Sequence, residues 1–353
     1  MALTRRNPAT KRSNSKQFNW FFPIVILIVL GFILGTGSYL RNAAISPLDE
    51  ETNLEINATT SRLQTQMGNY IQSLYGSRAL MSAQPNTSRL QWQKFYLNNG
   101  NVENLPSFGL MAFMRRVPAS QKTAFVSGVK NDTSITPDGY PNFSIHPDVV
   151  KDEYFVIDYI EPFNLTTQQQ SFGFDYSSDP TRRAAYEKAR DTNSPIMTNP
   201  MKSLSASATV LVIVLPVYNQ ALPQLTPDQR RAAFQGFTAL GIRTQDFFDE
   251  SFKDLSKDIS VEVYDGTEIS PDHRLYDSNK EMKVLGASSQ IKTHVEVRTI
   301  LAADRTWTLV FKHKEPLSDF LLLKNFYSRI AALLVTNLAC AILVWRLARK
   351  QRK

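Results

Sequence analysis

The sequence predicts an α+β fold in which a long N-terminal helix precedes two α+β units, all between two transmembrane helices. Three observations predict it: an apolar segment near each end of the chain, a long apolar stripe with helical spacing after the first segment, and alternating strand-like and helix-like segments from Ser107 onward. With 353 residues, the chain is long enough for two domains of average size.

The charge distribution favours a membrane protein over a nucleic-acid-binding protein. The formal net charge is +8, but two acid-free tails, 1–19 and 346–353, hold ten Lys and Arg residues, so the rest of the chain carries −2. A protein that binds DNA or RNA needs a basic surface against the phosphate backbone. We therefore expect no nucleic-acid partner.

Each basic tail flanks a predicted membrane span. Residues 20–40 are 21 residues without a charge, close to the ~20 that a transmembrane helix needs. The alternative is a cleaved signal peptide, but its apolar core is usually about 7–15 residues, and no clean A-x-A cleavage site follows Arg41. Residues 326–345 form the second predicted span, in which Arg329 lies near the helix end and can reach the interface. A buried amphipathic helix is the alternative there.

Basic residues outside both spans predict that both termini are cytoplasmic, so the intervening part faces the periplasm or cell exterior from an inner (plasma) membrane. The single cysteine, Cys340, falls in the second span, so the exterior part has no disulfide, which is more typical of a bacterial envelope. Five N-x-S/T sequons occur, at Asn57, Asn86, Asn131, Asn142 and Asn164. They are chance matches in a bacterial chain and glycan acceptors in a eukaryotic one.

A long stalk helix is predicted over 45–85. Its apolar residues recur at spacings of four, three and seven, and no proline interrupts it between Pro47 and Pro85. The stripe consists of Ile56, Leu63, Met67, Ile71, Leu74 and Met81. It can pack against the same helix of a second copy in a homodimer, or against its own domain; both interpretations stay open.

The segments after the stalk predict two units, 86–223 and 224–315, separated near Pro223 and Pro227. In the first, a mixed sheet is expected from "FGLMAFMRRVP", "YFVIDYI" and the doubly buried "ATVLVIVLPVY", with a helix over "TRRAAYEKARDT" capped by Ser178 or Asp179. In the second, we expect strands at 236–242, "ISVEVYD", "HRLYDS" and "RTWTLVFKH", and a helix at 244–255.

Motifs for catalysis are lacking in the sequence. The four histidines are scattered without metal-ligand spacing, and neither a Gly-rich phosphate loop, G-x-S-x-G nor HExxH occurs. Acids gather at Asp158, Glu161, Asp175 and Asp179, and acids at strand ends and caps are usually structural. We therefore expect no enzyme activity, no metal and no cofactor, and a structural role for Asp158, Glu161 and Asp179.

Five ordered blocks resemble the CHASE domain, the extracellular sensory module of histidine kinases and nucleotide cyclases that also occurs in cytokinin receptors. The blocks are "RRVP", "YFVIDYIEP", "GFDYSSDPTRRAAYEKARDT", "PIMTNP" and "LPVY". With the later "VYD", "LYDS" and "RTW" segments, the resemblance extends over about 45–315. It implies a long helix followed by two PAS-like units.

The resemblance also implies a ligand site. Asp175 in "GFDYSS" matches the acid that hydrogen-bonds the family's ligand, and Met197 and Thr198 in "PIMTNP" match the block on the other side of the pocket, Met197 mainly through its backbone and apolar contact. Phe237 is expected to close the floor. Capping of the following helix is the alternative role of Asp175.

The function predicted is a membrane-anchored sensor that binds a small molecule outside the cytoplasm and passes a signal across the membrane. Family members usually continue into a kinase or cyclase, whereas "RLARKQRK" follows the second span here. Either the output domain is missing from this sequence, or a separate cytoplasmic kinase or cyclase is the partner; both interpretations stay open. The alternative is a membrane-held scaffold or assembly subunit that contacts another envelope protein.

Overall fold

The computed structural model describes residues 15–100, 105, 108–162, 170–203, 208–278, 293–314 and 328–337, with single positions at 339, 340, 342, 343 and 346. The chain divides into two compact units: Glu55–Lys314, and the two ends, Met1–Leu54 with Glu315–Lys353. In the second of these, residues 328–337 are helical.

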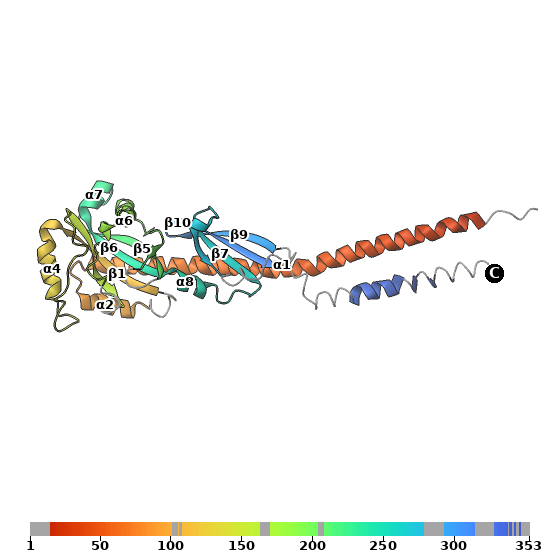
Figure 1. Cartoon of the computed structure of the whole chain (residues 1–353), viewed down its shortest axis with the longest axis horizontal. Helices are drawn as coiled ribbons and strands as arrows, with labels where there is room; N and C mark the ends of the chain where they lie inside the picture. Colours follow the sequence, from red (N-terminus) through yellow and green to blue (C-terminus); the bar gives the residue numbers. More distant parts are fainter. Residues whose placement is uncertain are drawn as a thin grey trace, which may run out of the picture. The chain divides into compact units, whose positions relative to one another are not determined.

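The chain begins with two helices, continues with alternating helices and strands, and has strands at the end of Glu55–Lys314 (Figure 1). The helices are α1 (Ser15–Ala83), α2 (Arg89–Asn98), α4 (Lys122–Lys130), α6 (Pro180–Thr192), α7 (Pro227–Ala233) and α8 (Thr244–Ser251), with short 3-10 turns η1 (Ala119–Gln121), η2 (Tyr176–Ser178) and η3 (Pro271–His273). The strands are β1 (Phe108–Pro118), β2 (Glu153–Glu161), β3 (Ile196–Met197), β4 (Met201–Lys202), β5 (Thr209–Tyr218), β6 (Phe234–Arg243), β7 (Ile259–Asp265), β8 (Arg274–Asp277), β9 (Thr293–Ala302) and β10 (Arg305–Lys314).

The strands form two sheets. The first has the order β2-β1-β6-β5-β3, with β4 also paired to β5, and the second has the order β8-β7-β10-β9. Every pair of named strands is antiparallel, so the expected mixed sheet is wrong, while the α+β class is confirmed. Because β6 lies between β1 and β5, the six-stranded sheet continues past the expected division at 223/224.

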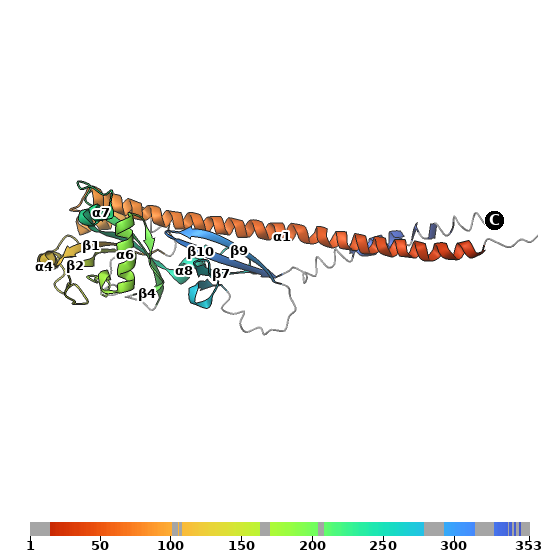
Figure 2. The same ribbon diagram turned by 90° about the horizontal axis from the view of Figure 1, so that it is seen from above.

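The stripe of α1 packs against its own chain. Ile56, Leu63, Met67 and Leu74 are at most 1% exposed and share one core with β5, β6, β7 and β10. In Figures 1 and 2, α1 accordingly lies alongside the strands of both sheets. The face expected for a dimer is therefore occupied within the molecule over these turns. The helix also begins earlier than expected and includes Pro47.

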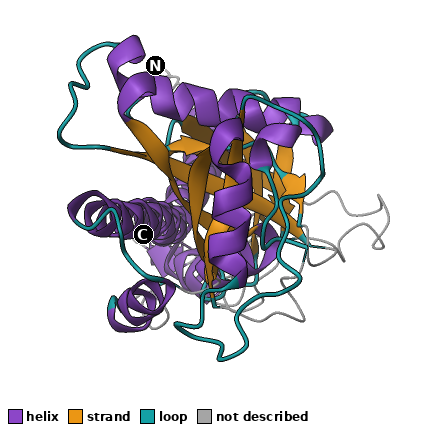
Figure 3. Ribbon diagram, turned by 90° about the vertical axis from the view of Figure 1, so that its left-hand side faces the viewer, coloured by secondary structure: helices purple, strands orange, loops and turns teal. Residues whose placement is uncertain are grey.

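The other face of the six-stranded sheet is covered by α6. Side chains of β5 alternate, so that Leu211 and Ile213 face α1, whereas Val212 and Val214 pack with Tyr186 and Ala189 of α6. Figure 3, which views the chain end-on, shows helices on both sides of these strands. The sheet is thus buried on both faces, as the unbroken apolar run of β5 predicts.

No helix among the described residues is long and apolar enough to cross a membrane. The predicted spans, 20–40 and 326–345, fall largely outside those residues: α1 is helical through 20–40, but most of its side chains there are not described. The two spans remain predictions.

A buried ion pair fastens α2 to the six-stranded sheet. Arg89 Nη2 lies 3.0 Å from Asp158 Oδ1, and Arg115 Nε lies 2.6 Å from Asp158 Oδ2; the side chains of Arg89 and Asp158 are each 4% exposed. The expected structural role of Asp158 is confirmed. Its charge and that of Arg115 act on the neighbouring Tyr159, whose pKa burial raises to about 12.

We predict that Asp158→Ala lowers the free energy of unfolding by about 3–5 kcal/mol, because it removes the carboxylate shared by the buried Arg89 and by Arg115 and leaves Arg89 with only the 3.3 Å pair to Asp132. The control is Asp254→Ala, which breaks an exposed pair with Arg62, of 3.3 Å, and should cost less than about 1 kcal/mol. Denaturant unfolding in detergent, followed by circular dichroism, measures both. Equal losses in the two variants would contradict this role.

Candidate functional site

The α6 face of the six-stranded sheet carries six packed rings, which we call the aromatic cluster. Its members are Phe155, Phe174, Tyr176, Tyr186, Phe234 and Phe237. Tyr186 lies 5.6 Å from Tyr176 and 5.3 Å from Phe237 between ring centroids, and Phe234 lies 4.6 Å from Phe237. The cluster offers an apolar surface with flat ring faces and edges.

The start of α6 places two polar side chains at this cluster. Asp179 caps the helix by accepting bonds from the N–H groups of Thr181 and Arg182, so the expected cap is confirmed, and Pro180 occupies the first turn. Arg182 and Tyr186 are four residues apart and therefore lie on one face of α6. The Arg182 guanidinium lies over the rings of Tyr176 and Phe174, 5.2 and 5.6 Å from their centroids.

Two buried polar atoms in this group have no hydrogen-bond partner among the described residues: Arg182 Nη1 and Tyr186 Oη. Tyr186 is 0% exposed and the Arg182 side chain 11%. Burial raises the pKa of Tyr186 well above its usual value, which keeps the hydroxyl neutral and able to donate. Buried donors without acceptors are destabilising, and they mark a position where a ligand acceptor would be favourable.

Asp175 lies beside the cluster, fully buried, with both carboxylate oxygens engaged. Oδ1 accepts bonds from Phe155 N (2.9 Å), Ser177 N (3.0 Å) and Ser177 Oγ (2.7 Å). Oδ2 accepts one from Lys151 Nζ at 2.7 Å. Asp175 therefore caps the short turn η2 and joins it to β2, whereas the cap of α6 itself is Asp179.

Of the other expected site residues, Phe237 belongs to the cluster, Thr198 is bonded to β5, and Met197 packs in a different core. Phe237 is 0% exposed and contacts Phe155 and Tyr186. Thr198 is bonded to β5: its N–H donates to Val212 O, and its Oγ1 accepts from Val212 N.

Met197 pairs with Ile213 and packs in the core on the α1 face. Its N–H donates to Asp304 Oδ1 (2.8 Å), and its carbonyl accepts from Arg305 Nε (3.2 Å). The four expected residues thus do not converge on one cavity, because strand alternation turns the Met197 side chain to the opposite face of the sheet.

Sequence reasoning missed Arg182 and Tyr186 as site residues. The available signal was their spacing of four after a capping aspartate, which puts them on one face of the first turns of α6. Arg182 also lies near the helix cap, with Nε 3.7 Å from Asp179 Oδ2.

Among the described residues, no group of three or more His, Cys, Asp or Glu is placed to hold a metal ion. Two of the scattered histidines do meet: His294 and His313 are paired across β9 and β10, with rings stacked 5.3 Å apart. Two rings alone fall short of the three or four protein ligands of a zinc site.

A family model described as "CHASE domain" matches residues 85–276, a shorter range than the 45–315 expected. No curated protein matches. Among solved structures, the chain is similar to an extracellular ligand-binding receptor from Desulfohalobium retbaense (10% identity, TM-score 0.44), covering 74% of this chain and 40% of that one. It is also similar to the ligand-binding domain of a Pseudomonas aeruginosa amino acid chemoreceptor in complex with GABA (12%, TM-score 0.43, 73% and 96% covered). A third is the extracellular domain of a putative histidine kinase (14%, TM-score 0.43, 79% and 100% covered).

The bonds of Asp175 predict a stability effect. Asp175→Asn should lower the free energy of unfolding by about 1–3 kcal/mol, since the ammonium of Lys151, 17% exposed, loses its carboxylate. Because these partners belong to the protein itself, the loss should appear without ligand. The matched control is Asp179→Asn, which should change stability by less than about 0.5 kcal/mol because asparagine caps a helix as well as aspartate does. Thermal and denaturant unfolding measure both; a neutral Asp175→Asn would contradict the assigned contacts.

Proposed function

The chain belongs to the CHASE domain family, and we propose that it is a membrane-anchored sensor whose exterior part binds a small molecule on the α6 face of the six-stranded sheet. The pair of buried, unpaired donors, Arg182 Nη1 and Tyr186 Oη, carries this proposal. Elsewhere in the described residues such atoms include Trp92 Nε1 and Trp307 Nε1, which come from separate cores. On α6 a cation and a hydroxyl come from adjacent turns and share one aromatic wall.

These groups favour a ligand with a flat, apolar body and a hydrogen-bond acceptor such as a carboxylate, carbonyl or ring nitrogen. The rings supply apolar and edge-to-face contact, and a guanidinium makes a strong charge-assisted bond to an acceptor. A molecule without an acceptor would leave the buried donors Arg182 Nη1 and Tyr186 Oη unsatisfied. The site would therefore discriminate against such molecules.

We propose that the four expected residues take part in different ways. Phe237 would form part of the aromatic wall, and Thr198, bonded to Val212 of β5, would border it. Asp175 would accept a ligand N–H in place of Lys151, which alone occupies Oδ2. Met197 would act through its backbone, by joining the site to the hairpin of β9 and β10.

Signal transfer, in this proposal, runs along α1 and β10 to the two predicted spans in a homodimer. The dimer contact would use a face of α1 other than the Leu63, Met67 and Leu74 stripe, for example the exposed positions Thr65 and Gln72. Ligand binding can shift the packing only by its difference in affinity for two arrangements, typically ~1–3 kcal/mol. The family model matched covers the sensor domain, and a kinase or cyclase output would be a further domain or a separate partner.

A scaffold or assembly subunit is the second candidate, and one surface favours it. Along β9, at the edge of the second sheet, Val295, Val297 and Leu301 are 55%, 46% and 60% exposed. Apolar side chains in a row on an edge strand are a typical contact for another protein.

Removal of the unpaired Tyr186 hydroxyl should have opposite effects on the stability of the free protein and on ligand binding. Tyr186→Phe should leave the ligand-free protein equally stable or up to about 1 kcal/mol more stable, because it removes a buried donor without a partner. It should also abolish the thermal shift given by whichever metabolite stabilises the wild type in a screen. Arg182→Gln should lose the same shift.

The control is Tyr218→Phe, since the buried Tyr218 hydroxyl donates to the carbonyl of Arg190. That change should destabilise by about 1 kcal/mol and keep the ligand shift. A destabilised Tyr186→Phe that still responds to the metabolite would exclude this site.

We predict that both termini are cytoplasmic. An alkaline phosphatase fused after Lys353 should be inactive, and one inserted at Asn131, in the exposed loop after α4, should be active, because the enzyme needs an oxidising compartment. An active fusion after Lys353 would remove the second span from the topology.

A further inference from the structure

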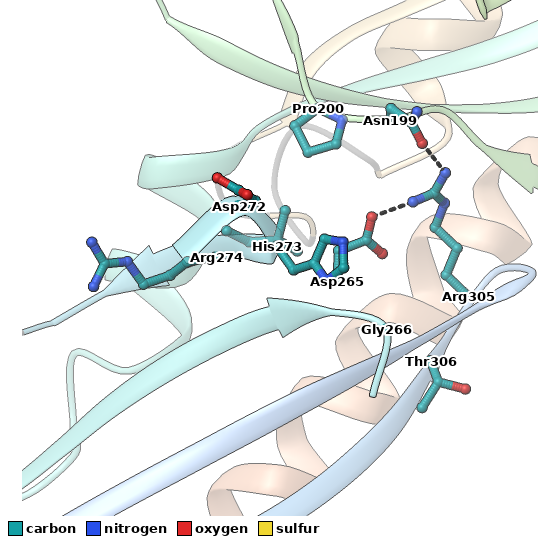
Figure 4. Close-up of a pocket in the computed structure, with 10 residues that line it drawn as sticks. Asn199, Pro200, Asp265, Gly266, Asp272, His273, Arg274, Arg305 and Thr306 are labelled. Carbon is teal, nitrogen blue, oxygen red and sulfur yellow. Dashed lines mark hydrogen bonds and ion pairs between the residues drawn. The ribbon is translucent and has the colours of Figure 1, made fainter. Parts of the chain in front are cut away.

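A cavity of about 580 Å³ opens beside the first strand residues of β10, away from the aromatic cluster. Figure 4 shows its walls: Asn199 and Pro200 follow β3, Asp265 ends β7 and Gly266 comes next, Asp272 and His273 belong to η3, and Arg305 and Thr306 begin β10. Its volume lies in the range of small-molecule sites, about 300–1,000 Å³, and several elements meet at it, as is common for such sites.

Arg305 is fixed on one side of this cavity. Its Nε donates to Met197 O, and its two terminal nitrogens bond Asp265 Oδ2 and Asn199 Oδ1 (Figure 4). A guanidinium has five N–H donors, so two remain for a ligand. The loop behind it is held as well, since Gly266 N donates to Thr306 O and Thr308 Oγ1 donates to Gly266 O. A donor held in this way loses little conformational freedom on binding.

Acceptors face the same cavity without partners. Asp265 Oδ1 has no hydrogen bond among the described residues, although this side chain is only 14% exposed. Asp272 lies on the opposite side from Arg305 in Figure 4, and within the described part of the chain its carboxylate makes no ion pair. The positive charge of Arg305 is offset by Asp265, whereas the negative charge of Asp272 is not offset.

We propose that this cavity is a second ligand site, for a small zwitterion that carries an amino group and a carboxylate. The carboxylate meets the remaining N–H groups of Arg305 and the amide nitrogen of Asn199. The ammonium meets Asp265 Oδ1 and Asp272. A simple anion would leave both aspartate acceptors unused and be repelled by Asp272, and a simple cation would leave the Arg305 donors unused.

A ligand in this cavity would affect the site of the proposed function on the α6 face. Arg305 holds the carbonyl of Met197, and its neighbour Asp304 bonds both Met197 N (2.8 Å) and Lys188 Nζ on α6 (2.8 Å). A ligand that binds Arg305 therefore acts on the same hairpin that contacts β3 and α6. The binding claim itself does not depend on the proposed function.

The experiment is isothermal titration of the full chain in detergent with glycine, β-alanine and ε-aminocaproate, whose charges lie progressively farther apart. Butyrate and n-butylamine are the singly charged controls. We expect one of the zwitterions to bind and both controls to bind at least about tenfold more weakly. Asp272→Asn, a surface change that leaves the fold intact, should weaken that zwitterion at least about tenfold.

Two further variants separate the possible sites. Asp258→Asn changes an exposed carboxylate outside the cavity and should leave binding unchanged. Arg182→Gln should also leave it unchanged, because Arg182 belongs to the aromatic cluster. Loss of binding in Arg182→Gln but not in Asp272→Asn would move the ligand to the α6 face and overturn the second site. Absence of zwitterion binding to the wild type, or equal binding of n-butylamine, would also overturn it.

Discussion

The contact between the apolar stripe of α1 and the two sheets is the constraint on which the rest of Glu55–Lys314 depends. One continuous core joins Leu63 and Met67 to β5 and β6 of the first sheet and to β7 and β10 of the second. Burial of this area is the main source of stability, at roughly 25 cal/mol per Å² of apolar surface. Because α1 covers one face of the six-stranded sheet, we propose ligand recognition on the other face. There α6, together with Ala233 of α7, packs into the core with β5 and β6.

Buried polar groups around β2 and α6 have two opposite energetic roles. Asp175 and Asp158 are buried carboxylates whose partners come from the protein, and they fix η2 and α2 to β2. Arg182 Nη1 and Tyr186 Oη are buried donors that have no hydrogen-bond partner among the described residues. A core built for stability alone would have replaced Tyr186 with phenylalanine at no loss of packing. Retaining the hydroxyl costs stability in the free protein, and a ligand acceptor would offset that cost.

Local signals in the sequence predicted most elements. The cap Asp179, the turn at Pro118 and the apolar run of β5 placed α6, β1 and β5 at nearly their observed bounds. Long-range pairing was not predictable in the same way: β6 inserts between β1 and β5, and that choice depends on contacts far apart in the chain. The two-residue strand β3 shows the consequence for the site. Its register with β5 decides that Ile196 faces α6 and Met197 faces α1, and two residues are too few for a periodic signal.

The hairpin of β9 and β10 gives Met197 a different significance from the one that the family resemblance implied. Its side chain is part of the core with α1, while its N–H and carbonyl are bonded to Asp304 and Arg305. Asp304 also pairs with Lys188, so one turn of the hairpin contacts both β3 and α6, the two elements nearest the proposed ligand. These bonds are partly exposed, and each contributes only about 1 kcal/mol. Contacts of that strength can rearrange without unfolding either sheet, which a ligand-controlled sensor requires. The apolar core that both sheets share with α1 keeps the sheets together during such a rearrangement.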